Sequence, residues 1–196
     1  MKNPVPVEDL GKLDFTRIEL LDNWAKYLRT GLSEYLEDRR PAYWLNIARG
    51  CCKNCVYCGG SREGYRVITG REKMAFRPPE SVAEDVEVLH DKGVKLIRFS
   101  HDPELFGEEY SLKLFKEIRE RGVEVYVYWE SFSVPSRRVL EEAVKTFRGV
   151  DVAVSPESAS EEVRFSAGRE ITNEALFKSL EFADELGVLI EIYFLI

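Results

Sequence analysis

Residues 79–100 read PESVAEDVEVLHDKGVKLIRFS. The first part of this stretch, 79–92, predicts a helix with Ser81 as its N-cap, and Gly93 is the stop signal that follows it. The next seven residues, Val94–Ser100, are mostly apolar and predict a short buried strand. Together they form one helix-glycine-strand unit.

The same unit recurs three times further along the chain: helix 109–121, Gly122 and strand 123–129; helix 135–147, Gly149 and strand 150–154; helix 172–186, Gly187 and strand 188–196. A strand at 43–48 precedes them all. This alternation predicts an α/β fold with about five parallel strands joined by right-handed crossovers. Two architectures fit, a closed or partial (β/α) barrel and a doubly wound open sheet.

The chain before residue 43 is predicted to be a connector. Residues 1–14 contain two prolines and no hydrophobic period, whereas apolar side chains from Asp14 to Arg40 recur near helical spacing. We expect one helix or two short helices there. The predicted organisation is a helical connector over 1–42 and an α/β core over 43–196.

All four cysteines fall within eight positions, in Cys51-Cys52-Lys53-Asn54-Cys55-Val56-Tyr57-Cys58. Cys51, Cys55 and Cys58 can bind one inorganic centre from a single loop, whereas the side chain of Cys52 points away from that of Cys51. Structural zinc normally takes four ligands in two separated pairs, and a second pair is missing here. Three cysteines suit a four-iron, four-sulfur cluster with one open iron. A zinc knuckle or a reactive-thiol loop is the alternative.

The spacing Cys51-x3-Cys55-x-Tyr57-Cys58 resembles the signature of the radical S-adenosylmethionine (SAM) enzymes. The flanking residues 48–50 and 59–61 are similar to the branch in which a cobalamin-binding domain precedes the radical domain. The resemblance implies a partial barrel, a [4Fe-4S] cluster, SAM bound to the open iron with Tyr57 near its adenine, and an external electron donor. SAM would be cleaved reductively to a 5′-deoxyadenosyl radical.

Both candidate architectures place chemistry at the carboxyl ends of the strands. Polar residues follow the apolar strands there: the cysteine loop, then residues 100–103, then Glu130 and Ser131, then residues 155–158. We therefore expect one concave site fed by four loops. A glycine-rich phosphate loop does not follow the first strand, which disfavours Rossmann or P-loop nucleotide binding.

The resemblance extends over residues 43–196 and implies roles for three charged residues. Glu157 matches the position that holds the ribose of SAM, Arg169 the arginine that meets the methionine carboxylate, and Glu130 a further carboxylate on SAM. The sequence departs from the family after the second strand of the core, where residues 100–102 replace a glycine-rich stretch. Asp102 could accept a hydrogen bond from the methionine amine there. His101 is a candidate proton donor or a hydrogen-bonded structural residue.

The formal net charge is −7, which argues against a protein that mainly grips nucleic acid. Residues 49–77 nevertheless carry seven basic and two acidic side chains, which would compensate an anionic cluster or attract an anionic substrate, or else form a solvated loop.

The sequence contains neither an apolar run long enough to span a membrane nor a secretory signal pattern, and it contains no Gln. We expect a cytoplasmic protein of a thermophile.

The predicted function is that of a radical SAM enzyme domain acting on an unknown small or macromolecular substrate. The alternatives are a structural or electron-transfer iron-sulfur or zinc module, and a barrel fragment that binds SAM without catalysis. The resemblance also implies a further helix-strand unit after residue 196. We therefore expect residues 191–196 to form an apolar sheet edge that pairs with a second copy or else causes aggregation.

Overall fold

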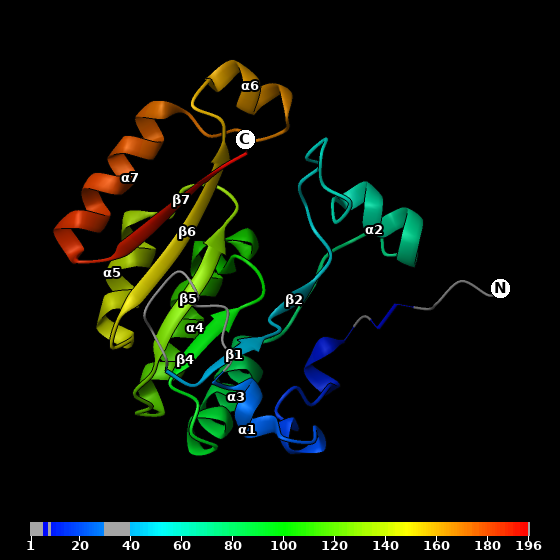
Figure 1. The fold of residues 1–196 in the computed structure, drawn as a ribbon, viewed down its shortest axis with the longest axis vertical. Coiled ribbons are helices and arrows are strands. Elements are labelled where there is room, and N and C mark those ends of the chain that lie inside the picture. The colour runs from blue at the N-terminus through cyan, green and yellow to red at the C-terminus, as the bar shows by residue number, and fades with distance from the viewer. Residues whose placement is uncertain (1–5, 8, 30–39, 196) are drawn as a thin grey trace.

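The computed structural model describes residues 6–7, 9–29 and 40–195 and contains a five-stranded parallel sheet (Figure 1). Its strands lie in the order β1 (Ala42–Leu45), β4 (Leu96–Phe99), β5 (Tyr126–Ser131), β6 (Val150–Glu157) and β7 (Leu189–Phe194). All four neighbouring pairs are parallel. The predicted α/β class is confirmed.

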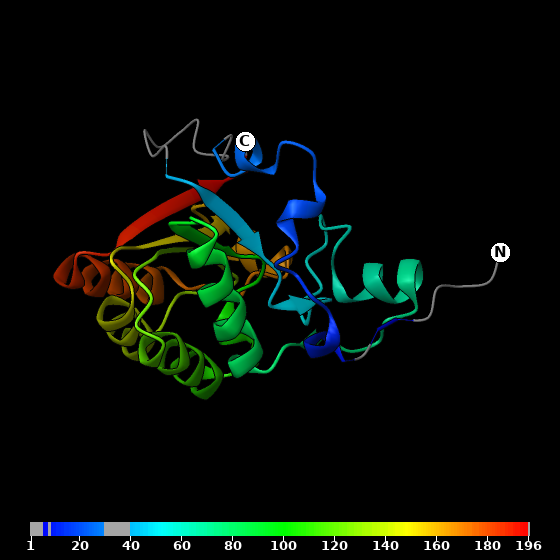
Figure 2. The same ribbon diagram turned by 90° about the horizontal axis from the view of Figure 1, so that it is seen from below.

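The order of the strands decides between the two architectures. Each strand pairs with the next strand of the sheet along the chain, whereas a doubly wound sheet reverses its order at a switch point. Figures 1 and 2 show the crossover helices on one face of a curved sheet. The N-terminal segment lies beside β1 and the end of α3 (Pro79–Asp91), where Phe15 accepts from Tyr43 and Thr16 from Lys92. The sheet is therefore part of a (β/α) barrel.

The crossover helices are α3 (Pro79–Asp91), α4 (Glu108–Glu120), α5 (Arg137–Thr146) and α7 (Asn173–Leu186). Apolar residues of these helices and alternate strand residues such as Ile97, Phe99 and Trp129 form one core cluster. The intervening strand residues face the concave side of the sheet. This division leaves the concave side free to carry polar side chains.

Several predicted boundaries were wrong. Helix α3 begins at Pro79 with Pro78 as its N-cap, so Ser81 lies inside the helix and does not cap it. A proline fits the first helical position because its missing N–H has no partner there in any case. Strand β6 runs on to Glu157, three residues past the predicted end, and its pairing with β7 shifts register between Val154 and Glu157.

Several short elements were not predicted. The cysteine loop lies between β2 (Ala48–Arg49) and β3 (Ala75–Phe76), which pair antiparallel, and the helix α2 (Arg62–Thr69) follows the loop. A further short helix, α6 (Glu161–Ser166), separates β6 from α7. Two-residue strands are too short to leave a periodic pattern in the sequence.

For residues 14–40 the sequence predicted one helix or two short helices, and the described part contains short helices only. Residues 9–29 form η1 (Leu10–Lys12), η2 (Ile18–Leu20) and the single helical turn α1 (Trp24–Tyr27), while residues 30–39 lie outside the described part. The amide of Ala42 donates to the carbonyl of Leu28 at 2.8 Å, so this segment is joined to the start of β1. Every helix in the described ranges is too short or too polar to cross a membrane.

Candidate cofactor site

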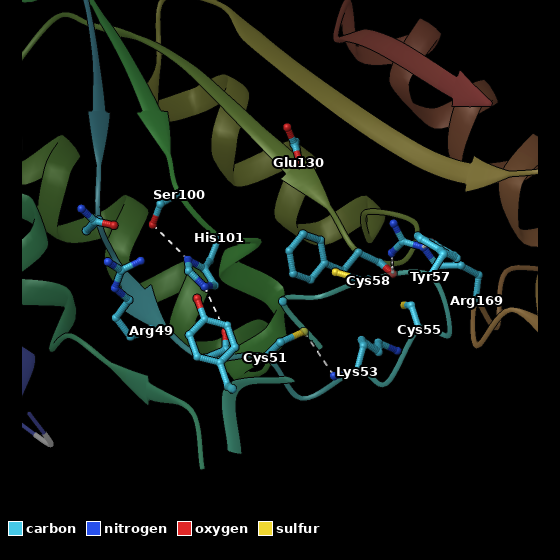
Figure 3. A pocket seen from close by; sticks show the side chains of 15 residues that line it. Arg49, Cys51, Lys53, Cys55, Tyr57, Cys58, Ser100, His101, Glu130 and Arg169 are labelled. Atoms are coloured by element: carbon cyan, nitrogen blue, oxygen red, sulfur yellow. Dashed lines mark hydrogen bonds between the residues drawn. The ribbon is translucent and has the colours of Figure 1, made fainter. Parts of the chain in front are cut away.

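A cavity of about 410 Å³ opens at the carboxyl ends of β1, β4 and β5. Its wall includes three of the four cysteines, together with these residues from the strand ends and the loops that follow them: Asn46, Arg49, Gly50, Lys53, Tyr57, Gly60, Tyr65, Ser100, His101, Glu130, Phe132 and Arg169. Figure 3 shows these side chains around the cavity. Loops far apart in sequence therefore meet in one concave site.

Cys51, Cys55 and Cys58 line this cavity, whereas Cys52 is exposed and does not. The loop turns tightly, since the amide of Cys58 donates to the carbonyl of Cys55 at 3.1 Å. The amide of Lys53 donates to the sulfur of Cys51 at 3.3 Å. Burial raises the pKa of the Cys51 thiol, and this amide opposes the shift. A bound metal would reverse it by holding the thiolate.

The donor set suits a multi-iron cluster. Within the described residues, no group of three or more His, Cys, Asp or Glu side chains is placed to share a single metal ion. In a four-iron cluster each cysteine binds a different iron, so the three sulfurs need not converge on one point. Three thiols on one wall of a shared cavity fit that group.

His101 hydrogen-bonds to Gly50, the residue directly before the cysteine loop. Its Nε2 lies 3.1 Å from the carbonyl oxygen of Gly50, which only accepts, so Nε2 carries the proton. Nδ1 then accepts from the hydroxyl of Ser100 at 3.0 Å, and that oxygen accepts from the amide of Ile47 at 3.2 Å. Burial lowers the pKa of His101 and favours this neutral form. Both ring nitrogens are engaged, although the ring also lines the cavity.

The other side of the cysteine loop rests on the segment that follows α6. The amide of Val56 donates to the carbonyl of Ala167 at 3.2 Å, and the thiol of Cys55 donates to the carbonyl of Gly168 at 3.8 Å. Gly168 has a φ of +83°, and a Cβ there would lie 3.2 Å from the Cα of Cys55. Only glycine fits this close approach without strain.

Tyr57, Glu157 and Arg169 form one hydrogen-bonded group beside the cysteines. The Tyr57 hydroxyl donates to Oε1 of Glu157 at 2.9 Å and accepts from Nε of Arg169 at 3.0 Å. Arg169 Nη2 lies 3.1 Å from the same carboxylate oxygen. Burial and then the bond to Glu157 raise the pKa of Tyr57 to about 12. Glu157 has a φ of +69°, which is rare for a residue with a side chain.

The remaining predicted residues lie in different surroundings. Glu130 closes β5 and lines the cavity, where loss of hydration raises the pKa of its carboxyl group. Asp102 is fully buried and is not part of the cavity wall. Its carboxylate accepts from the amides of Glu104 and Phe132, both at 2.9 Å, so it holds the loop after β5. This position does not favour contact with a methionine amine.

Sequence reasoning missed several cavity residues, including Asn46, Phe132 and Tyr65. Asn46 and Phe132 directly follow strand ends, so reading one residue further along each strand finds them. Tyr65 belongs to α2, which the sequence pattern did not reveal. The guanidinium of Arg169 lies 5.9 Å from the centre of the Phe132 ring and donates to its carbonyl at 3.2 Å.

Comparison with known proteins identifies the protein family. The model of the radical SAM superfamily matches residues 45–196. The chain belongs to this superfamily. It is 28% identical over 146 residues to the ribosomal protein uS12 methylthiotransferase RimO of Lachnoclostridium phytofermentans, covering 68% of this chain and 31% of that protein. The chain thus spans about a third of the length of the curated relatives it matches.

Solved structures of TsrM and OxsB resemble the fold. The radical SAM methyltransferase TsrM of Kitasatospora setae, solved with a SAM analogue, matches with a TM-score of 0.64 at 16% identity, covering 88% of this chain and 32% of TsrM. A second TsrM structure holds cobalamin and a [4Fe-4S] cluster. The cobalamin-dependent radical SAM enzyme OxsB matches with a TM-score of 0.60 at 15% identity over 77% of this chain and 23% of OxsB. Both structural neighbours are cobalamin-dependent radical SAM enzymes.

Proposed function

We propose that this chain is a radical SAM enzyme domain in which Cys51, Cys55 and Cys58 hold a [4Fe-4S] cluster. The observation that carries the proposal is that these three thiols share one cavity with Glu130 and Arg169. When bound, the reduced cluster supplies the electron that cleaves SAM to methionine and a 5′-deoxyadenosyl radical. An external reductant provides that electron.

The chain's own residues supply the binding of SAM. Arg169 offers a guanidinium fork that matches a carboxylate, and Glu157 offers acceptors for the ribose hydroxyls. In the structure these two residues pair with each other and with Tyr57. They are therefore already oriented beside the cysteines, and SAM would exchange one set of hydrogen bonds for another. The Tyr57 ring is half exposed at the same wall and is proposed to flank the adenine.

The structure favours different roles for the two remaining candidates. Glu130 lines the cavity and is proposed as a further carboxylate toward SAM. Asp102 and His101 are assigned positioning roles, because their polar atoms are used within the protein. The relatives TsrM and OxsB suggest that the parent protein combines this domain with cobalamin, and methyl transfer is then the reaction that fits.

Anaerobic reconstitution tests the proposal. We expect about four irons per chain and reductive formation of 5′-deoxyadenosine from SAM. Cys55→Ala should lose the cluster, whereas Cys52→Ala is the matched control and should keep it, since Cys52 lies outside the cavity wall. Equal loss of iron in both variants contradicts the ligand assignment.

The same preparation separates the alternatives. Glu157→Ala and Arg169→Ala should keep their iron but bind SAM roughly tenfold to a hundredfold more weakly, the effect of losing a charge-assisted hydrogen bond. Iron without SAM binding indicates an electron-transfer module, one zinc per chain indicates a zinc module, and SAM binding without cleavage indicates a non-catalytic fragment.

A further inference from the structure

The concave face of the sheet continues below the cofactor cavity. Trp44, Arg98 and Tyr128 are register partners on β1, β4 and β5. Two positions after each of them, in the same order, come Asn46, Ser100 and Glu130, which line the cavity. Two residues of a strand span about 6–7 Å and point to the same face. These three side chains therefore form the layer directly beneath the cavity lining.

Arg98 is the unusual member of this layer. Only 7% of its surface is exposed, and in the described ranges of the chain it has no carboxylate partner of the kind found for Arg77 and Arg169. Its buried Nε has no acceptor. The guanidinium lies 5.6 Å from the Trp44 ring centre and 5.5 Å from that of Tyr128. Ring faces attract the cation but accept none of its five N–H donors in a hydrogen bond.

Other buried arginines of this molecule have carboxylate or carbonyl partners. Arg77 Nη1 pairs with Asp85 at 2.6 Å and donates to the carbonyl of Asn46 at 3.2 Å, although its Nε, like that of Arg98, has no acceptor among the described residues. Arg164 donates to the carbonyls of Ser158 and Ile171, both at 2.7 Å. Arg169 pairs with Glu157. A buried guanidinium is costly without an acceptor, and the fold supplies one in each of these cases. For Arg98, the described part of the chain supplies no carboxylate, and the buried Nε has no acceptor.

The layer is also reachable. The Trp44 side chain packs edge-on against the Tyr128 ring, with 5.9 Å between the ring centres, yet 38% of Trp44 is exposed. The exposed part of Trp44 therefore offers a ligand an indole surface next to the guanidinium of Arg98, which is itself largely buried. Arginine suits planar oxyanions because its fork donates two parallel hydrogen bonds.

We propose that Arg98, flanked by Trp44 and Tyr128, is an oxyanion-binding site for a ligand that carries a carboxylate or a phosphate group. Its identification with the substrate of the radical chemistry rests on the proposed function, whereas the binding of an oxyanion does not. The substrate would extend from the cofactor cavity along the concave face, with its anionic group on Arg98.

A titration followed by the tryptophan indole signals in ¹⁵N-edited NMR tests the site. The chain contains three tryptophans, so Trp24 and Trp129 serve as internal references for Trp44. Sodium phosphate and sodium acetate, added at constant ionic strength to protein without iron or SAM, distinguish a phosphate from a carboxylate ligand. We expect a saturable shift of Trp44 alone with at least one of the two anions.

Variants make the assignment specific. Arg98→Met should weaken the binding roughly tenfold to a hundredfold. Arg148→Met is the matched control, because Arg148 is an exposed arginine paired with Glu124, and its binding should equal that of the wild type. If Arg98→Met fails to fold, Arg98→Lys keeps the charge without the fork and should still bind severalfold more weakly.

Three results overturn the site: a Trp44 shift no larger than that produced by sodium chloride, equal affinity in the Arg98 variants and the wild type, or equal loss in Arg148→Met. Because the titration needs neither iron nor SAM, its failure is distinguishable from failure of the proposed function. In that event Arg98 serves only to pack the two rings.

Discussion

The Tyr57 hydroxyl lies 2.9 Å from Oε1 of Glu157, although 100 positions separate the two residues in sequence. This bond joins the cysteine loop to the end of β6, and Arg169 closes the group by bonding to both partners. The proposed cluster loop and the proposed SAM-binding residues are therefore held as one unit before either ligand binds.

Tyr57→Phe should loosen the cysteine loop while keeping the ring. A hydrogen bond to a charged group contributes about 1.5–3 kcal/mol, so amides of residues 53–58 should exchange with deuterium roughly tenfold to a hundredfold faster. Tyr193→Phe is the control, since the Tyr193 hydroxyl also bonds to a carboxylate, that of Glu191 at 2.7 Å, but on β7. Unchanged exchange in Tyr57→Phe contradicts the tie between loop and strand.

Gly168→Ala should disturb the cysteine loop more than a backbone effect alone explains. Both Gly168 and Gly70 have positive φ angles, +83° and +71°, but only at Gly168 does an added Cβ meet neighbouring atoms. In each variant the left-handed conformation of the alanine costs about 1 kcal/mol or more of stability. Chemical denaturation should show the larger loss in Gly168→Ala, and iron retention after reconstitution should fall in that variant only.

Glu104 makes stability depend on pH. Burial, and then the neighbouring charge of Asp102, raises the pKa of Glu104 to about 7. Because this pKa is higher in the folded than in the unfolded chain, the contribution of Glu104 is fully present below about pH 4.5 and is lost as pH rises through 7.

Glu104→Gln should remove that dependence. Its side-chain oxygen can still accept from the Ser136 amide, which lies 3.1 Å from the Glu104 carboxylate. Between pH 5 and 8 the free energy of unfolding of the wild type should fall relative to the variant by about 2–3 kcal/mol. The exposed residue Glu109 provides the control variant Glu109→Gln. Parallel pH profiles of wild type and Glu104→Gln contradict the assignment.

Strand β7 is expected to mediate self-association. It lies at one end of the strand order and exposes the apolar side chains of Leu189, Tyr193, Phe194 and Leu195. Light scattering should show mass increasing with concentration, and Phe194→Lys should reduce the increase, because charges on an edge oppose strand pairing. Phe177→Lys is the control, since Phe177 is 63% exposed on α7, away from the edge. A monomer at every concentration contradicts this expectation.

The sequence by itself determined the features that are local along the chain. Each crossover helix ends near a glycine and leads to a strand, and this order of elements dictates parallel pairing. The three cysteines lie within eight residues, so their spacing alone indicates a shared centre. The boundaries were less certain because caps such as Pro78 and the bulge before Glu157 depend on neighbouring segments.

Only the tertiary structure decided which residues far apart in the sequence contact and hydrogen-bond one another. His101 bonds to Gly50 across 51 positions, and Cys55 meets Gly168 across 113. Arg77 has a carboxylate partner in Asp85, whereas the described residues supply none for Arg98, and this difference cannot be predicted from two similar arginines in a sequence. The physical reason is that hydrogen bonds and steric fit act over a few ångströms, so partners are chosen by the folded arrangement of strands and loops.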